Sequence, residues 1–300
     1  MTAAESRPSL SSASSITYRP FAADDIAAAH ALSTRFAWPH RTDDWRFVFD
    51  VGSGFVAESA GQVIGTALCW KFGQEAGSIG MVIVDPDWQG QGIGRQLMER
   101  LLSTLGDRLT LLHATPAGQP LYEKLGFVAI GTLHQHQSAN FTPPPVVLLP
   151  GERLRPLQAG DTPRIVELAS RATGVDRGAL LPPLLDIAEG VVLERDGELL
   201  GFSLYRRFGR GYAIGPIAAL APDTTDEPPL RRAQTLVGHW LEANPGTFIR
   251  VDTPGHSGLS PWLTGIGLPC VDIGVKMARN GTPVLDPSVG SYGIVNQAVG

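Results

Sequence analysis

The chain has 300 residues, of which 43% are hydrophobic and 18% are charged, and its formal net charge is −5. This length is enough for two domains of ordinary size, each with a core of its own. No apolar run approaches the length that spans a bilayer, and no run of Lys and Arg is long enough to neutralise a row of phosphates. We therefore expect a protein that binds neither a membrane nor nucleic acid.

The N-terminal segment is rich in Ser and Ala and lacks the apolar core and cleavage pattern of a secretory signal, which predicts a disordered leader over residues 1–15. The two cysteines, Cys69 and Cys270, stand in apolar, strand-like surroundings without a C-x-x-C or histidine spacing. They are expected to be buried hydrophobic residues, as suits the reducing cytoplasm. Neither a disulfide nor a metal is expected.

An internal repeat with a constant offset of 136 residues organises the chain. Residues 19–25 return at 155–161, and each set leads into a helical pattern of apolar residues. A hairpin and the end of a buried strand return at the same offset: 54–65 with 190–201, and 84–87 with 220–223. The chain is therefore predicted to contain two copies of one fold.

Each copy is predicted to run helix, hairpin, central strand, helix, strand, helix, strand. This order indicates an α/β (α+β) fold, a mixed and mostly antiparallel sheet flanked by helices. The first copy is expected over residues 16–140 and the second over 153–280. A Pro-rich linker joins them over 141–152. Residues 281–300 have no clear period and are expected to be loop or a late edge strand.

A glycine-rich turn follows the apolar strand 81–84 of the first copy and opens an amphipathic helix. Glycine has no Cβ atom, so successive N–H groups can converge on a pyrophosphate, and the helix N-terminus adds a partial positive charge. The turn is therefore expected to bind phosphates through Gln89, Gly90, Gln91, Gly92, Ile93, Gly94 and Arg95.

This turn, together with the segment LYEKLGF at 121–127, resembles the GNAT superfamily of acyl-CoA-dependent N-acetyltransferases. The resemblance covers residues 16–136 well and the second copy more faintly, as in two-domain members with a divergent C-terminal GNAT-like domain. It implies acetyl-CoA or a related acyl-CoA as co-substrate. It also implies that the Tyr122 hydroxyl faces the thioester sulfur and that the pantetheine is bound by the backbone of Val82, Ile83 and Val84.

The second copy lacks both motifs. Residues 225–230 stand opposite the glycine turn with no glycine, two prolines and two carboxylates. Leu263 stands opposite Tyr122. We therefore predict a degenerate second copy and one CoA site per chain.

Amine acylation by a thioester requires a neutral amine, an oxyanion stabiliser and a proton for the departing thiolate. The resemblance implies that a backbone N–H near Val82 or Ile83 stabilises the oxyanion and that Tyr122 supplies the proton for the thiolate. Many relatives carry a glutamate base on the fourth strand, but strand 79–84 has no ionisable side chain. His113 is the candidate base because histidine titrates near neutrality, and a satisfied interior histidine is the alternative.

Acceptor residues in this superfamily tend to come from the segment between the first two helices. Here Asp44 is a candidate partner for a substrate ammonium, with Trp38, His40 and Trp45 in the same segment as candidate pocket residues. The alternative is an ordinary helix start at Asp43 or Asp44, with Trp45 packed inward.

The second copy offers two further candidates, Asp252 and His256, directly after a predicted strand at 248–251. They would close the acceptor cleft if the strand ends of the two copies face each other. If the copies pack back to back, Asp252 is only a loop cap.

The leading hypothesis is an N-acyltransferase that acts on a primary amine of a small molecule. An alternative is an acyl-CoA-binding sensor without turnover, suggested by the missing fourth-strand carboxylate. A dinucleotide-binding oxidoreductase fits less well, because its G-x-G-x-x-G turn follows the first strand and precedes an acidic residue about twenty positions later. The acceptor, the acyl-chain preference and the choice between monomer and homodimer are left open.

Overall fold

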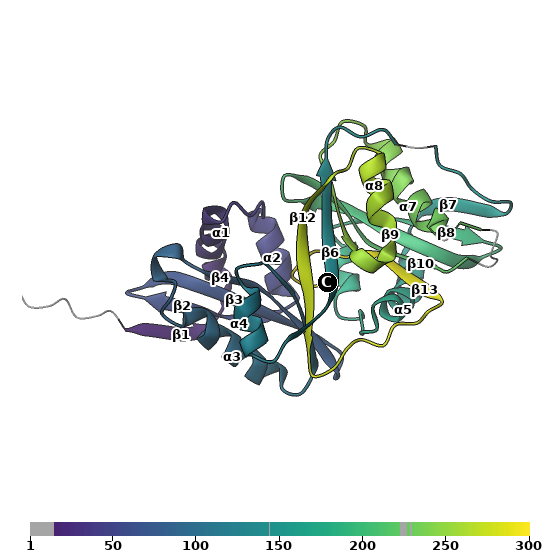
Figure 1. The fold of residues 1–300 in the computed structure, drawn as a ribbon. Helices are drawn as coiled ribbons and strands as arrows, with labels where there is room; N and C mark the ends of the chain where they lie inside the picture. The colour runs from purple at the N-terminus through teal and green to yellow at the C-terminus, as the bar shows by residue number, and fades with distance from the viewer. Residues whose placement is uncertain (1–14, 144, 223–226, 229) are drawn as a thin grey trace, which may run out of the picture.

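The computed structural model describes residues 15–143, 145–222, 227–228 and 230–300, so the predicted leader lies outside the described residues except for Ser15. The strands form one continuous 13-stranded sheet, with helices packed on it in both halves (Figure 1). The predicted mixed α/β architecture is confirmed. Among the described residues, no helix combines the length and the apolar character that crossing a membrane requires.

The first copy contains the predicted elements in the predicted order, with a strand added before the first helix and a second helix before the hairpin. In chain order its elements are β1 (Ile16–Pro20), α1 (Ile26–Arg35), α2 (Thr42–Asp50), β2 (Ser53–Ser59), β3 (Gln62–Phe72), β4 (Ala76–Val84), α3 (Ile93–Leu105), β5 (Leu109–Ala114), α4 (Gln119–Lys124) and β6 (Val128–Ser138). Helix α3 packs its apolar face on β2, β3 and β4, and its five inward-facing side chains are buried: Ile93, Leu97, Met98, Leu101 and Leu105.

The second copy repeats this order. Its elements are β7 (Glu152–Pro156), α5 (Thr162–Thr173), α6 (Leu181–Leu185), β8 (Glu189–Arg195), β9 (Glu198–Phe208), β10 (Gly211–Leu220), α7 (Arg231–Ala243), β11 (Ile249–Pro254), α8 (Leu259–Gly265) and β12 (Cys270–Arg279). A further strand, β13 (Val289–Gly293), follows within the C-terminal segment and pairs with β10.

The sequence repeat has a matching set of ion pairs. In the first copy Arg19 binds both Asp25 and Glu58, and in the second copy Arg155 binds both Asp161 and Glu194. Each arginine therefore ties the first strand of its copy to the start of the first helix and to the next strand. This shared contact explains why the RP dipeptide and the following aspartate return at the same offset.

The two copies exchange their last strands. Strand β12 lies between β5 and β6 and is antiparallel to both, while β6 lies between β12 and β11. Each copy's fifth strand therefore pairs with the last strand of the other copy. In Figure 1 the two exchanged strands run side by side at the junction of the halves.

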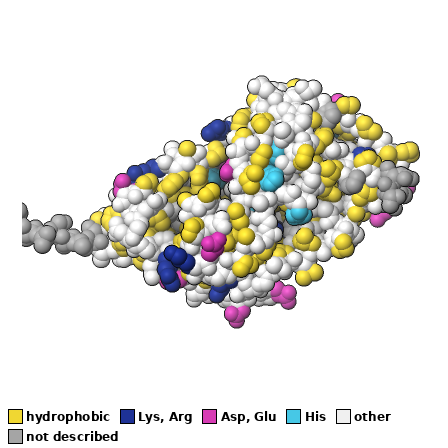
Figure 2. All heavy atoms as spheres, viewed as in Figure 1, with side chains coloured by type: hydrophobic (Ala, Val, Ile, Leu, Met, Phe, Trp, Pro, Cys, Tyr) yellow, Lys and Arg dark blue, Asp and Glu magenta, His cyan; other side chains and the backbone are white. Residues whose placement is uncertain are grey.

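Hydrophobic packing also joins the copies. One buried cluster contains residues of α1 and α2 together with residues of α5 and α6, including Ile26, Trp45, Ile165 and Leu184. On the face shown in Figure 2, histidine side chains gather over the junction of the halves, and Lys and Arg side chains are scattered. The copies are thus continuous in both sheet and core.

Candidate active site

Strands β4 and β5 separate at the centre of the first copy. They pair in parallel only where residues 76–78 meet residues 109–111. Met81 has a φ of 53°, its carbonyl accepts a hydrogen bond of 2.8 Å from the Thr66 hydroxyl, and the β3–β4 register shifts at this point. This bulge turns the end of β4 away from β5, and the strand edge at residues 82–84 faces a groove.

The glycine turn forms the end of this groove. Gly90 and Gly92 have φ values of 81° and 79°, in the left-handed region that glycine adopts without strain. The first intrahelical hydrogen bond of α3 runs from the Gln96 amide to the Gly92 carbonyl, so the amides of residues 93–95 lack an intrahelical acceptor. These amides and the helix dipole favour an anion at this place.

The groove has a volume of about 570 Å³ and runs from the glycine turn along β4 to α4. Tyr122 of α4 lines it, and its side chain is buried, so burial raises the pKa of the phenol to about 12. The phenol therefore keeps its proton throughout the neutral range. An unpaired strand edge next to a set of free amides fits the amide-containing arm and the phosphates of acyl-CoA.

A second cavity, of about 260 Å³, adjoins the groove. Four residues line both spaces: Trp38, Val82, Thr115 and Tyr122. The other walls come from both copies and from the C-terminal segment, and include His40, His113, Gln135, Phe208, Arg250, Asp272 and Gln297. The second copy therefore closes a cavity that opens onto the groove of the first. We call it the acceptor cavity, after the role that we propose for it below.

His113 of β5 lies at the wall of the acceptor cavity. Its Nδ1 is 2.9 Å from the carbonyl oxygen of Gln297, and because a carbonyl only accepts, Nδ1 carries the proton and Nε2 has the lone pair. Burial lowers the pKa of His113 to about 4. His40 is kept neutral in the same way, since burial, and then the charge of Arg250, lowers its pKa to about 4.

Asp252 and Arg250 form a buried ion pair on β11. The Arg250 Nε is 2.9 Å from Oδ1 of Asp252, and its Nη2 is 2.7 Å from Oδ2. Arg250 lines the acceptor cavity, whereas Asp252 does not. The aspartate, expected to anchor an amine, instead orients the arginine.

Asp44 and Trp45 also lie elsewhere than expected. The Asp44 carboxylate is buried and accepts hydrogen bonds from the Arg41 amide at 2.8 Å, the Arg41 guanidinium at 3.0 Å and the Gly209 amide at 3.0 Å. It begins α2 and ties it to the second copy. Asp44 does not line the acceptor cavity, and its carboxylate accepts from these protein donors rather than facing a substrate ammonium. Trp45 has no exposed surface and stacks on Phe21, so it belongs to the core.

His256 lies outside the acceptor cavity and lines a separate one. The sequence did not single out several residues of the acceptor cavity, among them Gln135, Phe208, Arg250, Asp272 and Gln297. Strand exchange and the C-terminal segment bring them to the site, and neither leaves a local pattern in the sequence. Arg250 lies two positions before Asp252, which the sequence had singled out.

The equivalent cleft of the second copy is filled by the chain itself. β13 pairs with β10 at residues 217–220, which correspond to 81–84, and the Ile294 amide donates to the Asp252 carbonyl at 3.0 Å. At the start of α7 the Glu227 carboxylate binds Arg231 and Arg232. Of the segment opposite the glycine turn, residues 225, 226 and 229 lie outside the described part of the chain.

Cys270 is partly exposed, in contrast to the buried position expected for it, and lies next to His134 and His136. The two imidazoles share the Ser260 hydroxyl, at 3.0 Å from His134 and 2.9 Å from His136, and His136 Nδ1 is 2.8 Å from the Leu268 carbonyl. These hydrogen bonds satisfy the cluster without another ligand. No local spacing indicates this cluster, because the two histidines lie on β6 and the cysteine on β12.

The comparisons with known proteins agree with this geometry. Two family models, each described as an acetyltransferase (GNAT) domain, match residues 50–129 and 165–293. An uncharacterised N-acetyltransferase of Bacillus subtilis (strain 168), YitH, is 27% identical over 250 residues, which cover 81% of this chain and 84% of that protein.

Two solved structures show the same fold. A Pyrococcus horikoshii protein named provisionally as an acetyltransferase superposes with a TM-score of 0.75 at 19% identity, over 99% of both chains. A tandem GNAT protein from the clavulanic acid biosynthesis pathway gives a TM-score of 0.62 at 14% identity, over 89% of this chain and 99% of that one.

The fold, the groove and the family matches together define an acetyltransferase of the GNAT class. Each half of the sheet carries one of the two matched domains. The chain belongs to the GNAT family as a tandem member, and its family implies acetyl-CoA as the acyl donor.

Proposed function

We propose that this protein transfers an acetyl group from acetyl-CoA to a primary amine of a small molecule, at one site per chain in the first copy. The observation that carries this proposal is the junction of the groove with the acceptor cavity at Trp38, Val82, Thr115 and Tyr122. A volume of about 260 Å³, walled by both copies, suits a small acceptor better than a protein segment.

Acetyl-CoA supplies the activated acetyl group as a thioester. In the proposal its phosphates bind the amides of the turn at 89–95, and its amide-containing arm binds the free edge of β4 at residues 82–84. A backbone N–H of Val82 or Ile83 stabilises charge on the carbonyl oxygen that is attacked. Tyr122, which keeps its proton because its pKa is about 12, protonates or hydrogen-bonds the departing thiolate.

The acceptor is held by the remaining walls of the cavity. His113 presents the lone pair of Nε2 to the amine and accepts its proton, while the Gln297 carbonyl fixes the tautomer. Trp38 and His40 contact the acceptor, and Asp44 and Asp252 act as positioning residues through α2 and Arg250.

A second candidate function is an acyl-CoA sensor without turnover. β4 carries no carboxylate at the site, and His113, with a pKa of about 4, is a weak base. Both observations lower the expected rate of proton removal from the amine. Thiol release separates this candidate from the transferase.

Calorimetric titration with acetyl-CoA tests the cofactor site. We expect one site per chain, and at least 100-fold weaker binding for Gly92→Glu, because a carboxylate then meets the phosphates at the turn. Gly61→Glu is the matched control, since Gly61 also has a φ of 79° and open space around it, but lies in the β2–β3 turn. Two sites, or equal binding by both variants, would mean that the turn is misassigned.

A thiol-release screen over small amines then tests the chemistry. We expect turnover with at least one amine, and a kcat about 10²-fold lower for Tyr122→Phe, which loses the proton donor but keeps the ring. Tyr205→Phe is the control, because its hydroxyl is buried in the second copy without a hydrogen-bond partner among the described residues. Binding without thiol release from any amine would favour the sensor.

A further inference from the structure

The cavity that His256 lines lies between the two copies, beside the acceptor cavity. Its volume is about 40 Å³. Since one water needs about 10–15 Å³ of such volume, it holds roughly three waters or one small ion. His113 and Ala298 line both cavities and separate them. Two exposed residues, His256 and Leu285, also line this cavity.

Arg177 reaches this cavity from the segment after α5. Its side chain is 5% exposed, its Nη1 donates to the Val299 carbonyl at 2.9 Å, and its Nε donates to the Thr173 hydroxyl at 3.1 Å. Nη2 has no hydrogen-bond partner among the described residues. Both acceptors are neutral. The guanidinium also lies over the Phe72 ring, with its Cζ 4.7 Å from the ring centroid, and the charge of Asp176 acts on it without an ion pair. Burial accordingly lowers the pKa of Arg177 to about 10.

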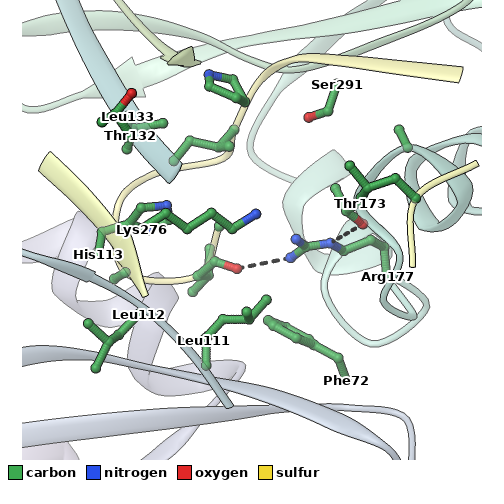
Figure 3. A pocket seen from close by; sticks show the side chains of 18 of the residues that line it. Phe72, Leu111, Leu112, His113, Thr132, Leu133, Thr173, Arg177, Lys276 and Ser291 are labelled. Carbon is green, nitrogen blue, oxygen red and sulfur yellow. Dashed lines mark hydrogen bonds between the residues drawn. The ribbon is translucent and has the colours of Figure 1, made fainter. Parts of the chain in front are cut away.

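Lys276 extends from β12 into the same cavity, toward Arg177 (Figure 3). Its Nζ has no hydrogen-bond or ion-pair partner within the described part of the chain. Burial, and then the charge of Arg177, lowers the pKa of Lys276. The two cations therefore face the same small space and repel each other.

No Asp or Glu side chain stands among the described residues that line this cavity. The nearest candidate in sequence, Asp176, accepts from the Gly178 amide at 2.7 Å and makes no ion pair with Arg177. Arg177 is buried and Lys276 is half-buried, and two such cations without an ion-pair partner are unfavourable in a medium of low dielectric unless an anion accompanies them. The cavity thus has the charge, the unused donors and the size for one small anion.

We propose that this cavity binds a small monoanion between Lys276 Nζ and Arg177 Nη2, and that the anion is a short carboxylate. The remaining walls favour a carboxylate over a halide because they are mostly apolar and can cover a short alkyl group. The apolar walls include Leu111, Leu112, Leu133 and Ile294, and hydroxyls come from Thr173 and Ser291. This site is separate from the proposed acetyl-CoA and amine sites.

The test is a titration of the full-length protein with sodium acetate. Binding is measured by calorimetry, and stability is measured as the midpoint of thermal unfolding. Ionic strength is held constant with a salt whose anion is too large for the cavity. A parallel arm uses sodium chloride. We expect saturable binding of one acetate per chain and a rise in the unfolding midpoint, with weaker binding of chloride.

Lys276→Met removes one cation and should weaken acetate binding at least tenfold. Lys71→Met is the matched control, because Lys71 is exposed on β3, and Lys276→Arg should retain binding because it keeps the charge. Acetyl-CoA binding should be unchanged in all three variants, which separates this inference from the proposed function. Equal acetate binding by Lys276→Met and the parent chain would overturn the site, and tighter binding of chloride would overturn the assignment to a carboxylate.

If Lys276→Met does not fold, acetate binding can still be tested in the parent chain and in Lys276→Arg. The measurement is the ¹³C resonance of labelled acetate. A bound resonance that exchanges with free acetate and disappears when chloride is raised at constant ionic strength would indicate a halide site. A bound resonance that survives chloride supports the proposal. The absence of any bound resonance in both proteins would refute it.

Discussion

Two imidazoles at the acceptor cavity are kept neutral by their surroundings. Burial lowers the pKa of both His113 and His40 to about 4, from an ordinary value of 6.5. These two imidazoles therefore present lone pairs rather than positive charges to the cavity at any pH near neutrality. This suits an amine acceptor, since a protonated imidazole would repel an ammonium group and could not accept a proton from it.

This burial predicts a loss of stability in acid. Between pH 6.5 and 4 the unfolded chain binds protons at these histidines that the folded chain does not, so the free energy of unfolding falls as the pH is lowered through this window. Each histidine contributes a loss of about 2 kcal/mol by pH 5. His113→Gln, which can still donate to the Gln297 carbonyl, should lose about 2 kcal/mol less than the parent chain between pH 8 and pH 5.

Urea denaturation at the two pH values measures this difference. The comparison at pH 8 gives the effect of the substitution on packing alone and so serves as the internal control. If the free energy of unfolding fell equally in the two proteins between pH 8 and pH 5, His113 would have to be protonated in the folded state at pH 5.

At the scale of the element, the C-terminal segment links the two clefts. β13 pairs with β10 in the second copy, and the chain then continues to the acceptor cavity, where Gln297 and Ala298 form part of the wall. Ala298 packs directly on β4, because a Cβ atom at Gly80 would lie 2.8 Å from the Ala298 Cα. The segment thus fixes the carbonyl that orients His113.

Gly80→Ala should therefore impair turnover without weakening the cofactor site. The added methyl group displaces Ala298 and, with it, the Gln297 carbonyl, at a cost of about 1–3 kcal/mol of stability. We expect kcat to fall about tenfold or more and acetyl-CoA affinity to stay within a factor of about two, since the glycine turn is unaffected.

Steady-state kinetics and calorimetry measure the two quantities. Gly131→Ala is the control, because no atom lies within 4 Å of a Cβ built at Gly131 of β6. If Gly80→Ala reduced affinity and kcat together, the C-terminal segment would have to be assigned to the cofactor site instead.

At the scale of the whole molecule, the strand exchange makes each half depend on the other. Without β12, β5 would lose its antiparallel partner on one side. Without β6, β11 would likewise lose its antiparallel partner and keep only β10. Unpaired strand edges are poorly tolerated in soluble proteins. We therefore expect that the two copies do not fold as separate domains.

Cleavage of the linker tests this dependence. With a protease site in place of residues 143–145, the cut halves should elute together at the size of the 31.9 kDa chain and unfold in one transition. The uncut variant is the control. Separation of the halves on gel filtration, each with native circular dichroism, would contradict the exchanged arrangement.

The repeat and the glycine turn were predictable because their patterns are local. The order of elements, the ion pairs of Arg19 and Arg155, and the position of the turn at the start of α3 all depend on residues within about fifty positions of one another. The exchange was not predictable, since β6 has the same pattern whether it pairs within its own copy or with β11.

The acceptor cavity shows the same limit. Trp38 and His40, which the sequence singled out, line the cavity because their segment follows α1 directly. Arg250 and Gln297 reach the cavity only through the exchanged sheet and the C-terminal segment. Asp44 was expected to bind an ammonium, but Gly209 of the other copy and Arg41 use its carboxylate. Sequence periodicity shows that a residue is buried and not which distant segment buries it.

The exchange of last strands also has a consequence for synthesis on the ribosome. β6 ends at Ser138, but its two neighbours, β11 and β12, are complete only at Arg279. At about 5–20 residues per second, the first half waits on the order of ten seconds with its sheet edge open. During that interval the nascent chain exposes the hydrophobic surface and unpaired backbone groups that chaperones bind, so the yield of active protein in a cell should depend on the speed of translation as well as on the stability of the finished fold.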